Sequence, residues 1–419
     1  LKREVGVPIH LHTHDTSGNQ LATLVKAYEA GVDIVDGALS AMSGLTSQPS
    51  LDGLVASLER TERETGLNLS HLQQLSNYWG SVRPYYVGFE SEMKSPTSEV
   101  YIHEMPGGQY TNLHQQAKAV GLGERWEEVK QMYRTVNMMF GDIVKVTPSS
   151  KVVGDMALFM VQNNLTEEDV YERGDRLDFP ASVVELFEGY IGQPPGGFPK
   201  RLQEIILKGR TPFTHRAGSQ LPPVDFDEVK KELVEKVGHD VDEYDVMSYT
   251  LYPQVFLDKE KMTREFGDIS VLDTPTFFYG LRIGEEVAVT IEQGKTLIVK
   301  LMAIGDVGPG GKRTVYFELN GQPREVSVVD LSADVTTEVH PKADPADEGH
   351  IGASMPGKVL NIMVEAGDEV KKGEHLIVTE AMKMETTVQA PYLAKVKAVH
   401  VKIGDAIESG DLLIELERK

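Results

Sequence analysis

Three histidines near the start of the chain have the spacing of metal ligands. The stretch VPIHLHTHDTSGNQ, residues 7–20, alternates apolar and polar residues as a strand does, and then turns towards a helix expected over residues 21–30. Side chains two apart on a strand point the same way, so His10, His12 and His14 should share one face. Two imidazoles from one strand can chelate a divalent metal, with further ligands from elsewhere. The alternative is a polar strand edge whose histidines only form hydrogen bonds.

A second candidate functional residue is Lys383, which lies between two methionines in VTEAMKMETTV, residues 378–388. A solvated surface lysine is the ordinary interpretation. The surrounding sequence is a repeat, however: PGKVLNIMVEAGDEVKKGEHLIVTE aligns with LAKVKAVHVKIGDAIESGDLLIELE at an offset of 37 residues. Each half alternates like half-buried strands and breaks at glycines, and neither half can bury a face alone. The repeat predicts a two-fold, flattened β-barrel with Lys383 in the hairpin between its halves.

These residues resemble the biotin-carrier domain of biotin-dependent carboxylases, whose signature EAMKME occupies residues 380–385. The resemblance implies that Lys383 carries biotin through an amide bond and that a biotin protein ligase is a partner. A lipoyl carrier has the same fold, but an acidic residue usually stands beside its lysine; an unmodified lysine is the other alternative. We assign residues 351–419 to this domain. Residues 336–350, rich in Pro, Asp, Glu and Ala, are predicted to be a semi-rigid, acidic, solvated linker.

The histidine stretch is followed by the pattern of an α/β barrel. A buried strand is expected over residues 32–36, followed by a loop of glycine and small residues, and in such barrels the sites form at the carboxyl ends of the strands. HTHDT resembles the metal site of the carboxyltransferase domain in the pyruvate carboxylase family. The resemblance implies that His12 and His14 bind zinc or manganese and that His10 is a neighbour. The family's other ligands, an aspartate and a carbamylated lysine, match nothing here, which implies that about six barrel strands and the ATP- and magnesium-using biotin carboxylase domain precede Leu1.

The middle of the chain, residues 51–253, has mainly helical periodicity, and VTPSSK (residues 146–151) stands at the start of one helix. Taken alone, it is a turn with Ser149 or Ser150 as N-cap, or a helix start that could bind a carboxylate or ureido group. VTPSSK and GGQYTNL (residues 107–113) both match the pyruvate carboxylase family. That resemblance makes Thr147 the catalytic residue that relays a proton between pyruvate and biotin, and places Ser150 and Lys151 beside it in the pocket for carboxybiotin and substrate. Residues 1–270 are assigned to the C-terminal part of the carboxyltransferase domain.

Residues 277–331, within a domain assigned to residues 271–335, return to a strand pattern, with turns at Gln293-Gly294, at residues 308–311 and at Asn320-Gly321, the last being a strong hairpin signal. This predicts a small β-rich domain. It resembles part of the tetramerisation (allosteric) domain of pyruvate carboxylases, which implies a homotetramer in the longer enzyme. No residue here is assigned to an acetyl-CoA site.

Composition excludes several other classes of protein. The chain has 42 basic and 64 acidic residues and a formal charge of -22, which argues against binding to nucleic acid. No apolar run is long enough to span a bilayer, and the absence of cysteine excludes disulfides and thiolate metal sites. We expect a soluble protein of the bacterial cytoplasm, with the mitochondrial matrix as the alternative.

The expected fold is multi-domain, α/β and all-β. It combines the last part of a TIM-type barrel, a helical extension, a small β domain and a flattened β-barrel (hammerhead) biotinyl domain. The expected function is transfer of a carboxyl group from carboxybiotin to pyruvate, giving oxaloacetate. Two alternatives stay open at this point: the α-subunit of an oxaloacetate decarboxylase, and an inactive biotin-acceptor or oligomerisation fragment.

Overall fold

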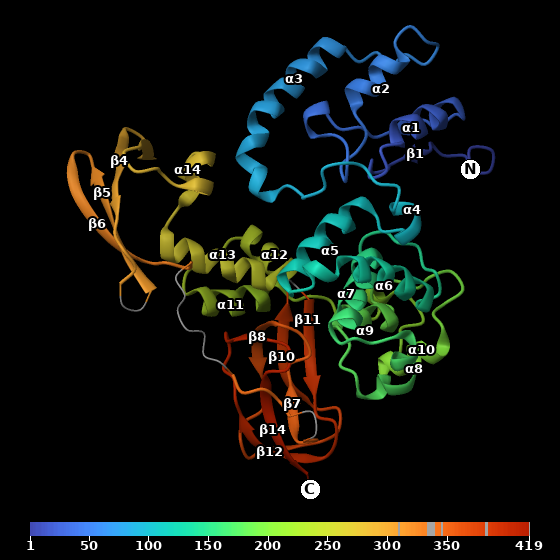
Figure 1. The fold of residues 1–419 in the computed structure, drawn as a ribbon, viewed down its shortest axis with the longest axis vertical. Coiled ribbons are helices and arrows are strands. Elements are labelled where there is room, and N and C mark those ends of the chain that lie inside the picture. The colour runs from blue at the N-terminus through green and yellow to red at the C-terminus, as the bar shows by residue number, and fades with distance from the viewer. Residues whose placement is uncertain (309–310, 333–339, 345–346, 382–383, 419) are drawn as a thin grey trace. The chain divides into compact units, whose positions relative to one another are not determined.

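The computed structural model describes residues 1–308, 311–332, 340–344, 347–381 and 384–418. Two compact units divide the chain: Leu1–Gln220 together with Glu338–Lys419, and Leu221–Thr337. Figure 1 shows the ribbon coloured along the chain. No helix among the described residues has the length and apolar character needed to cross a membrane.

The first unit opens with a strand–helix–strand element. Strands β1 (His10–Leu11) and β2 (Ile34–Val35) pair in parallel, and helix α1 (Gln20–Glu29) connects them, as the sequence predicts. Both strands are shorter than expected, however, and Ile34 is 48% exposed rather than buried. The reason is that the described sheet has two strands only, so no neighbouring strand extends the pairing or covers the outer edge. Leu24, Leu54 and Leu58 form a small core that joins α1 to α2 (Leu51–Leu58).

A helical layer follows and supplies the largest core. Its helices are α3 (Leu69–Val82), α4 (Val100–His103), α5 (Gly107–Ala119), α6 (Trp126–Met139), α7 (Ser149–Gln162), α8 (Glu167–Arg173), α9 (Ala181–Glu188) and α10 (Lys200–Leu207). Helix α7 lies at the centre, because its residues from 152 to 161 are all buried. Short 3-10 helices connect these and later elements: η1 (Ser40–Met42), η2 (Arg83–Phe89), η3 (Gly123–Arg125), η4 (Gly174–Arg176), η5 (Ala217–Ser219) and η6 (Ile269–Val271). The helical prediction for this region is confirmed.

The predicted cap of α7 is wrong. The N-cap is Pro148, which makes no side-chain capping bond, and Ser149 is already helical. The Ser149 hydroxyl instead donates to the carbonyl oxygens of Val144 (2.7 Å) and Val146 (2.6 Å) in the preceding loop. Ser150 is only 2% exposed and faces the core. The helix therefore starts one residue too early for Ser149 to cap it and two residues too early for Ser150.

The C-terminal repeat forms two four-stranded sheets, ordered β11-β10-β8-β13 and β7-β14-β12-β9. The strands are β7 (His350–Gly352), β8 (Gly357–Ile362), β9 (Glu369–Val370), β10 (His375–Ala381), β11 (Met384–Gln389), β12 (Ala394–Val399), β13 (Ala406–Ile407) and β14 (Leu412–Arg418). Equivalent residues of the two halves behave alike: Val359 and Val396 are both buried, and Gly367 and Gly404 have φ of 106° and 98°. Only glycine adopts such φ values without strain. The repeat and its flattened two-sheet fold are confirmed.

The described part of the predicted linker, residues 336–350, is largely exposed, but its backbone forms hydrogen bonds with the β domain. Pro341 accepts a hydrogen bond from the Leu412 amide (2.7 Å), and the Ala343 amide donates to the Gly410 carbonyl (2.8 Å). Lys342 forms ion pairs with Asp411 (2.8 Å) and Glu408 (3.3 Å). We call residues 340–344 the strap. Its backbone is paired with the turn before β14, a contact that composition does not indicate.

The described part of the second unit combines four helices with a β meander. Helices α11 (Phe226–Val237), α12 (Glu243–Leu251) and α13 (Pro253–Phe266) share a small apolar core, and α14 (Thr274–Tyr279) follows. Strands β3 (Glu286–Glu292), β4 (Lys295–Ile304), β5 (Lys312–Leu319) and β6 (Gln322–Val329) pair antiparallel in chain order. Residues 277–279, expected in the strand pattern, are helical. Asn320 and Gly321 both have positive φ, 47° and 78°, as the predicted tight hairpin requires.

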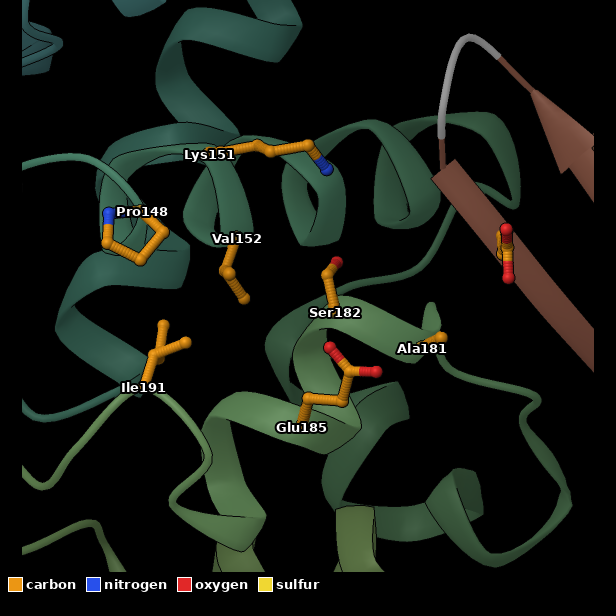
Figure 2. A pocket seen from close by; sticks show the side chains of 8 residues that line it. Pro148, Lys151, Val152, Ala181, Ser182, Glu185 and Ile191 are labelled. Carbon is orange, nitrogen blue, oxygen red and sulfur yellow. The ribbon is translucent and has the colours of Figure 1, made fainter. Parts of the chain in front are cut away.

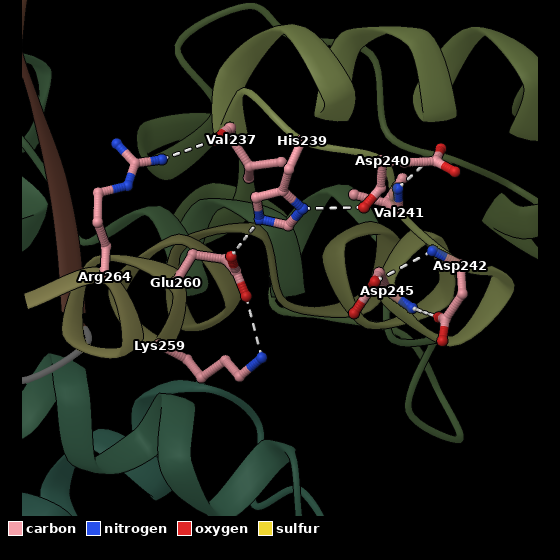
Figure 3. Close-up of polar contacts among 9 residues, drawn as sticks. All are labelled: Val237, His239, Asp240, Val241, Asp242, Asp245, Lys259, Glu260 and Arg264. Atoms are coloured by element: carbon pink, nitrogen blue, oxygen red, sulfur yellow. Dashed lines mark hydrogen bonds and ion pairs between the residues drawn. The ribbon is translucent and has the colours of Figure 1, made fainter. Parts of the chain in front are cut away.

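Polar contacts tie α11 to α13 (Figure 3). His239, just after α11, contacts Glu260 on α13 with its Nε2 (2.9 Å), and Lys259 donates to the same carboxylate (2.9 Å). Arg264 donates to the Val237 carbonyl (2.6 Å). These ties join α11 to α13. The compact unit that contains these helices also contains the β meander, whereas the sequence assigned residues 221–270 to the carboxyltransferase domain. The functional boundaries at residues 270, 335 and 350 stay predictions.

Candidate active site

The three predicted histidines form different contacts: His10 lies in β1, and His12 and His14 lie in the segment after it. His10 contacts Asp36 Oδ1 with Nε2 (2.8 Å), and His12 contacts Asp36 Oδ2 with Nδ1 (2.7 Å). Asp36 follows strand β2, so the parallel pairing brings its carboxylate beside the histidine face. The hydrogen bonds from His10 and then His12 lower the pKa of Asp36, which keeps it an ionised acceptor.

His14 is oriented by the backbone. Its Nδ1–H donates to the Thr46 carbonyl at 2.6 Å, and its ring lies 5.3 Å from that of His12, edge to face. In both His12 and His14 the Nδ1 atom is therefore held by an oxygen acceptor, which leaves Nε2 for a ligand. This is the usual arrangement around metal-binding histidines, where the outer acceptor fixes the tautomer and the ring orientation. The imidazole pair fits a divalent metal, although the described residues contain no group of three or more ligating side chains.

Helix α5 begins against this face. A Cβ atom on Gly107 would lie 2.7 Å from His14 Cβ and 2.8 Å from Thr16 Oγ1, distances that atoms not bonded to each other cannot share. Gly107 is thus required for the first turn of α5 to approach His14. Further along, α5 packs on α7: a Cβ on Gly154 would lie 2.6 Å from Gln109 Nε2. The GGQYTNL motif therefore connects the histidine face to α7, whose first turn contains the end of VTPSSK.

A pocket of about 390 Å³ opens beside the start of α7 (Figure 2). It is lined by side chains from α7, α9 and the loops beside them, and by one residue of β11: Pro148, Lys151, Val152, Ala181, Ser182, Glu185, Ile191 and Glu385. The pocket thus combines apolar walls with one cation, two carboxylates and a hydroxyl.

Charge in this pocket centres on Lys151. Its Nζ donates to Asp155 Oδ2 at 2.6 Å, one turn along α7, and Ser182 Oγ donates to the same oxygen at 2.6 Å. Burial raises the pKa of Glu185, and the charges of Glu188 and Glu385 raise it further, while Lys151 lowers it. The pocket therefore places the Lys151 ammonium group near the carboxyl groups of Asp155 and Glu185, and the pKa of Glu185 is raised.

The predicted site residues fall in different places. Lys151 lines the pocket, and Thr147 is exposed next to the lining residue Pro148. Ser150 is not among the lining residues, because it is turned into the core. Lys383, between β10 and β11, lies outside the described residues. These assignments stay predictions.

Sequence reasoning missed Asp36, Asp155, Ser182 and Glu185. Asp155 carried a local signal, since a carboxylate four residues after a lysine on a helix faces it. Asp36 could have been noticed as a polar residue at a strand end. Ser182 and Glu185 had no such signal, because only the packing of α9 on α7 brings them to Lys151.

Comparison with known proteins defines the class first. Three family models match: one described as HMGL-like over residues 1–78, a conserved carboxylase domain over residues 100–300, and a biotin-requiring enzyme domain over residues 349–416. With the strand–helix–strand start and the repeat-built β domain described above, they place the chain among the biotin-dependent carboxylases. The first part of the chain is thus part of a TIM-type barrel, and the last is a biotinyl domain.

Individual relatives narrow this class. The chain is 60% identical over 418 residues to pyruvate carboxylase of Bacillus subtilis, which matches 100% of this chain and 36% of that protein. It is similar to the structure of a complete multifunctional pyruvate carboxylase from Rhizobium etli, with 46% identity, a TM-score of 0.70 and coverage of 99% of this chain and 38% of that one. The carboxyl transferase domain of the Rhizobium etli enzyme, solved with pyruvate and biocytin, is 50% identical with a TM-score of 0.71, covering 79% and 56%. The chain belongs to the pyruvate carboxylase family, as a C-terminal portion spanning about a third of its curated relatives.

Proposed function

We propose that this chain performs the carboxyltransferase step of a pyruvate carboxylase and carries its biotin. A carboxyl group would move from biotin on Lys383 to the methyl carbon of pyruvate, giving oxaloacetate. The observation that carries the proposal is the histidine pair: His12 and His14 each have Nδ1 on an oxygen acceptor, beside the start of α5. Such a pair suits a catalytic metal, and the biotin-requiring domain of the same chain supplies the carboxyl donor.

Each predicted site residue has a separate role in the proposed carboxyl transfer. His12 and His14 would hold the divalent metal, zinc or manganese, which stabilises the negative charge on the pyruvate oxygen as the methyl proton leaves. The Thr147 hydroxyl would accept that proton and pass one to the biotin nitrogen released from the carboxyl group, so that no strong base is needed. Lys151 would line the place where biotin arrives, and Ser150, whose side chain is buried behind it, would act there only if its side chain turned towards the pocket. Biotin itself carries the carboxyl group on a ring nitrogen.

The remaining partners belong to the longer protein. A biotin protein ligase would modify Lys383. ATP and magnesium would act in a separate biotin carboxylase part, and the working form would be a homotetramer in the bacterial cytoplasm. Support for these proposals is the family membership and the 60% identity to a bacterial relative.

Intact-mass spectrometry with peptide mapping, on the chain co-expressed with a biotin ligase, is the first test. We expect a biotin-sized increase on Lys383, absent in Lys383→Ala. The activity test uses the chain within a polypeptide of full family length and measures oxaloacetate formed from pyruvate, bicarbonate and ATP. An unmodified Lys383 in a folded domain would contradict the carrier role. A biotinylated enzyme that only decarboxylates oxaloacetate would contradict the proposed reaction.

A further inference from the structure

Asp155 is the most deeply buried charged residue of the candidate site. Its side chain has no exposure, one oxygen accepts from both Lys151 and Ser182, and the other is buried without a hydrogen-bond partner among the described residues. Removing a carboxylate from water is costly unless partners compensate for the lost hydration. Here the compensation comes from one cation and one hydroxyl, and both belong to residues that line the pocket.

Lys151 needs such an anchor. Its side chain is 38% exposed, and a lysine stem has four rotatable carbons and a compact charge that many acceptors satisfy. A competing acceptor is near, because the Lys151 charge influences Glu185 across the pocket. The carboxylate of Asp155, fixed inside the helical core and at 2.6 Å from Nζ, holds the ammonium on the α7 side. Ser182 in turn fixes that carboxylate from α9.

We propose that Asp155 is a positioning residue which, with Ser182, fixes the Lys151 ammonium at the pocket wall for the ureido or carboxylate oxygens of the incoming biotin group. This inference rests on the proposed function. Asp155 does not contact the ligand. It restricts the side-chain conformations of Lys151, which does contact the ligand. A preoriented donor binds with a smaller loss of side-chain entropy, so Asp155 should act on the biotin-dependent step through Lys151 alone.

The test uses enzyme of full family length carrying Lys383→Ala, so that free biocytin is the only occupant of the pocket. Oxaloacetate is supplied, its carboxyl group is transferred to biocytin, and pyruvate formation is followed against biocytin concentration. We expect Asp155→Asn to lower kcat/KM for biocytin about tenfold, the scale of one hydrogen bond to a charged group, mainly through KM. Lys151→Met should lose at least as much. The double variant should equal Lys151→Met within about twofold, because Asp155 has no route to the ligand other than Lys151.

A matched control is available in Asp52→Asn. Asp52 is also a buried carboxylate that accepts from a serine hydroxyl (Ser40, 2.7 Å) and has one buried oxygen without a described partner, but it forms no ion pair with a lysine among the described residues. The Asp52→Asn enzyme should keep kcat/KM for biocytin within about twofold of the parent value. If Asp155→Asn does not fold, Ser182→Ala replaces it: kcat/KM for biocytin should fall about threefold and return with Ser182→Thr, which keeps the hydroxyl.

Two results would overturn the inference while leaving the proposed function intact. One is a folded Asp155→Asn enzyme that keeps a normal KM for biocytin. The other is a double variant whose losses multiply, which would mean that Asp155 acts independently of Lys151. If the parent Lys383→Ala enzyme shows no biocytin-dependent turnover although it is folded and holds metal, the proposed function itself fails and the inference falls with it.

Discussion

Acid should destabilise the first unit through one buried histidine, His103. It is 4% exposed, its Nδ1 accepts a hydrogen bond from the Met105 amide (3.0 Å), and its ring lies 5.7 Å from that of Tyr110. Burial, and then the nearby charge of Lys130, lower the pKa of His103 from 6.5 to about 4. The folded state therefore keeps this imidazole neutral at pH values where the unfolded chain binds a proton. A depressed histidine pKa means that stability is full above about pH 6.5 and is lost as the pH falls towards 4.

The size of the loss follows from the two pKa values. At pH 7 the unfolded histidine is mostly neutral and the cost is a few tenths of a kcal/mol. At pH 5, which is about 1.5 units below the unfolded pKa, protonation stabilises the unfolded chain by about 1.4 kcal/mol per unit. The folded state gains almost nothing, because its histidine is still mostly neutral at that pH. The free energy of unfolding should thus fall by about 2 kcal/mol between pH 7 and pH 5 on account of His103 alone.

The assay is urea unfolding at both pH values, followed by Trp126 fluorescence in a Trp79→Phe background. Trp126 donates to the Tyr110 hydroxyl (3.3 Å) and so reports on the cluster that contains His103. His103→Gln keeps a neutral acceptor and should remove about 2 kcal/mol of the pH dependence, although it lowers stability at pH 7. His71→Gln, an exposed change, controls for the loss of a histidine as such. An unchanged difference between wild type and His103→Gln at the two pH values would refute the reasoning.

Two further predictions concern the site and its surroundings. Gly107→Ala should push His14 out of position, because its new Cβ would lie 2.7 Å from His14 Cβ; we expect about a tenfold loss of zinc or manganese affinity, measured by calorimetry on full-length enzyme. Gly108→Ala is the control, since its nearest contact to His14 would be an ordinary 3.9 Å, and equal effects of the two changes would contradict the steric argument. Burial raises the pKa of Asp178 to about 6, against the opposing charge of Lys208, so this carboxyl adds stability at low pH that disappears as the pH rises from about 4 to 6. With a side chain still 24% exposed, wild type should lose about 2 kcal/mol relative to Asp178→Asn between pH 4 and 7, measured by urea unfolding; a difference that does not change with pH would contradict this.

The 37-residue repeat and the Asn-Gly turn were interpreted correctly from the sequence. The 37-residue offset predicts the shared burial of Val359 and Val396 because an alternating strand turns every second residue inwards. Asn320-Gly321 predicts a hairpin because both residues tolerate positive φ. The histidine face was predicted in part: His12 and His14 lie together, but Asp36 joins them only through the pairing of β1 with β2.

Features that depend on packing between distant segments were not predictable. The strap looks like a linker because Pro, Asp and Lys are frequent in linkers, yet its backbone finds partners near Gly410. Ser149 has the residue type of a helix cap, but its hydroxyl donates a hydrogen bond to a carbonyl oxygen of the preceding loop instead. Ser182 reaches Asp155 from 27 residues away, and no local pattern carries that contact.

The two halves of the biotinyl domain exchange strands, and this has a consequence for the order of events during synthesis. Strand β8 pairs with β13 of the second half, and β9 pairs with β12, so each sheet is completed only by residues beyond Ala394. A nascent chain that has just passed Lys383 therefore has the signature lysine but not the fold that presents it. If the ligase recognises the folded domain, biotin attachment must follow translation of the last strand. A stop codon even a few residues before β14 would then yield a carrier that is made but never loaded.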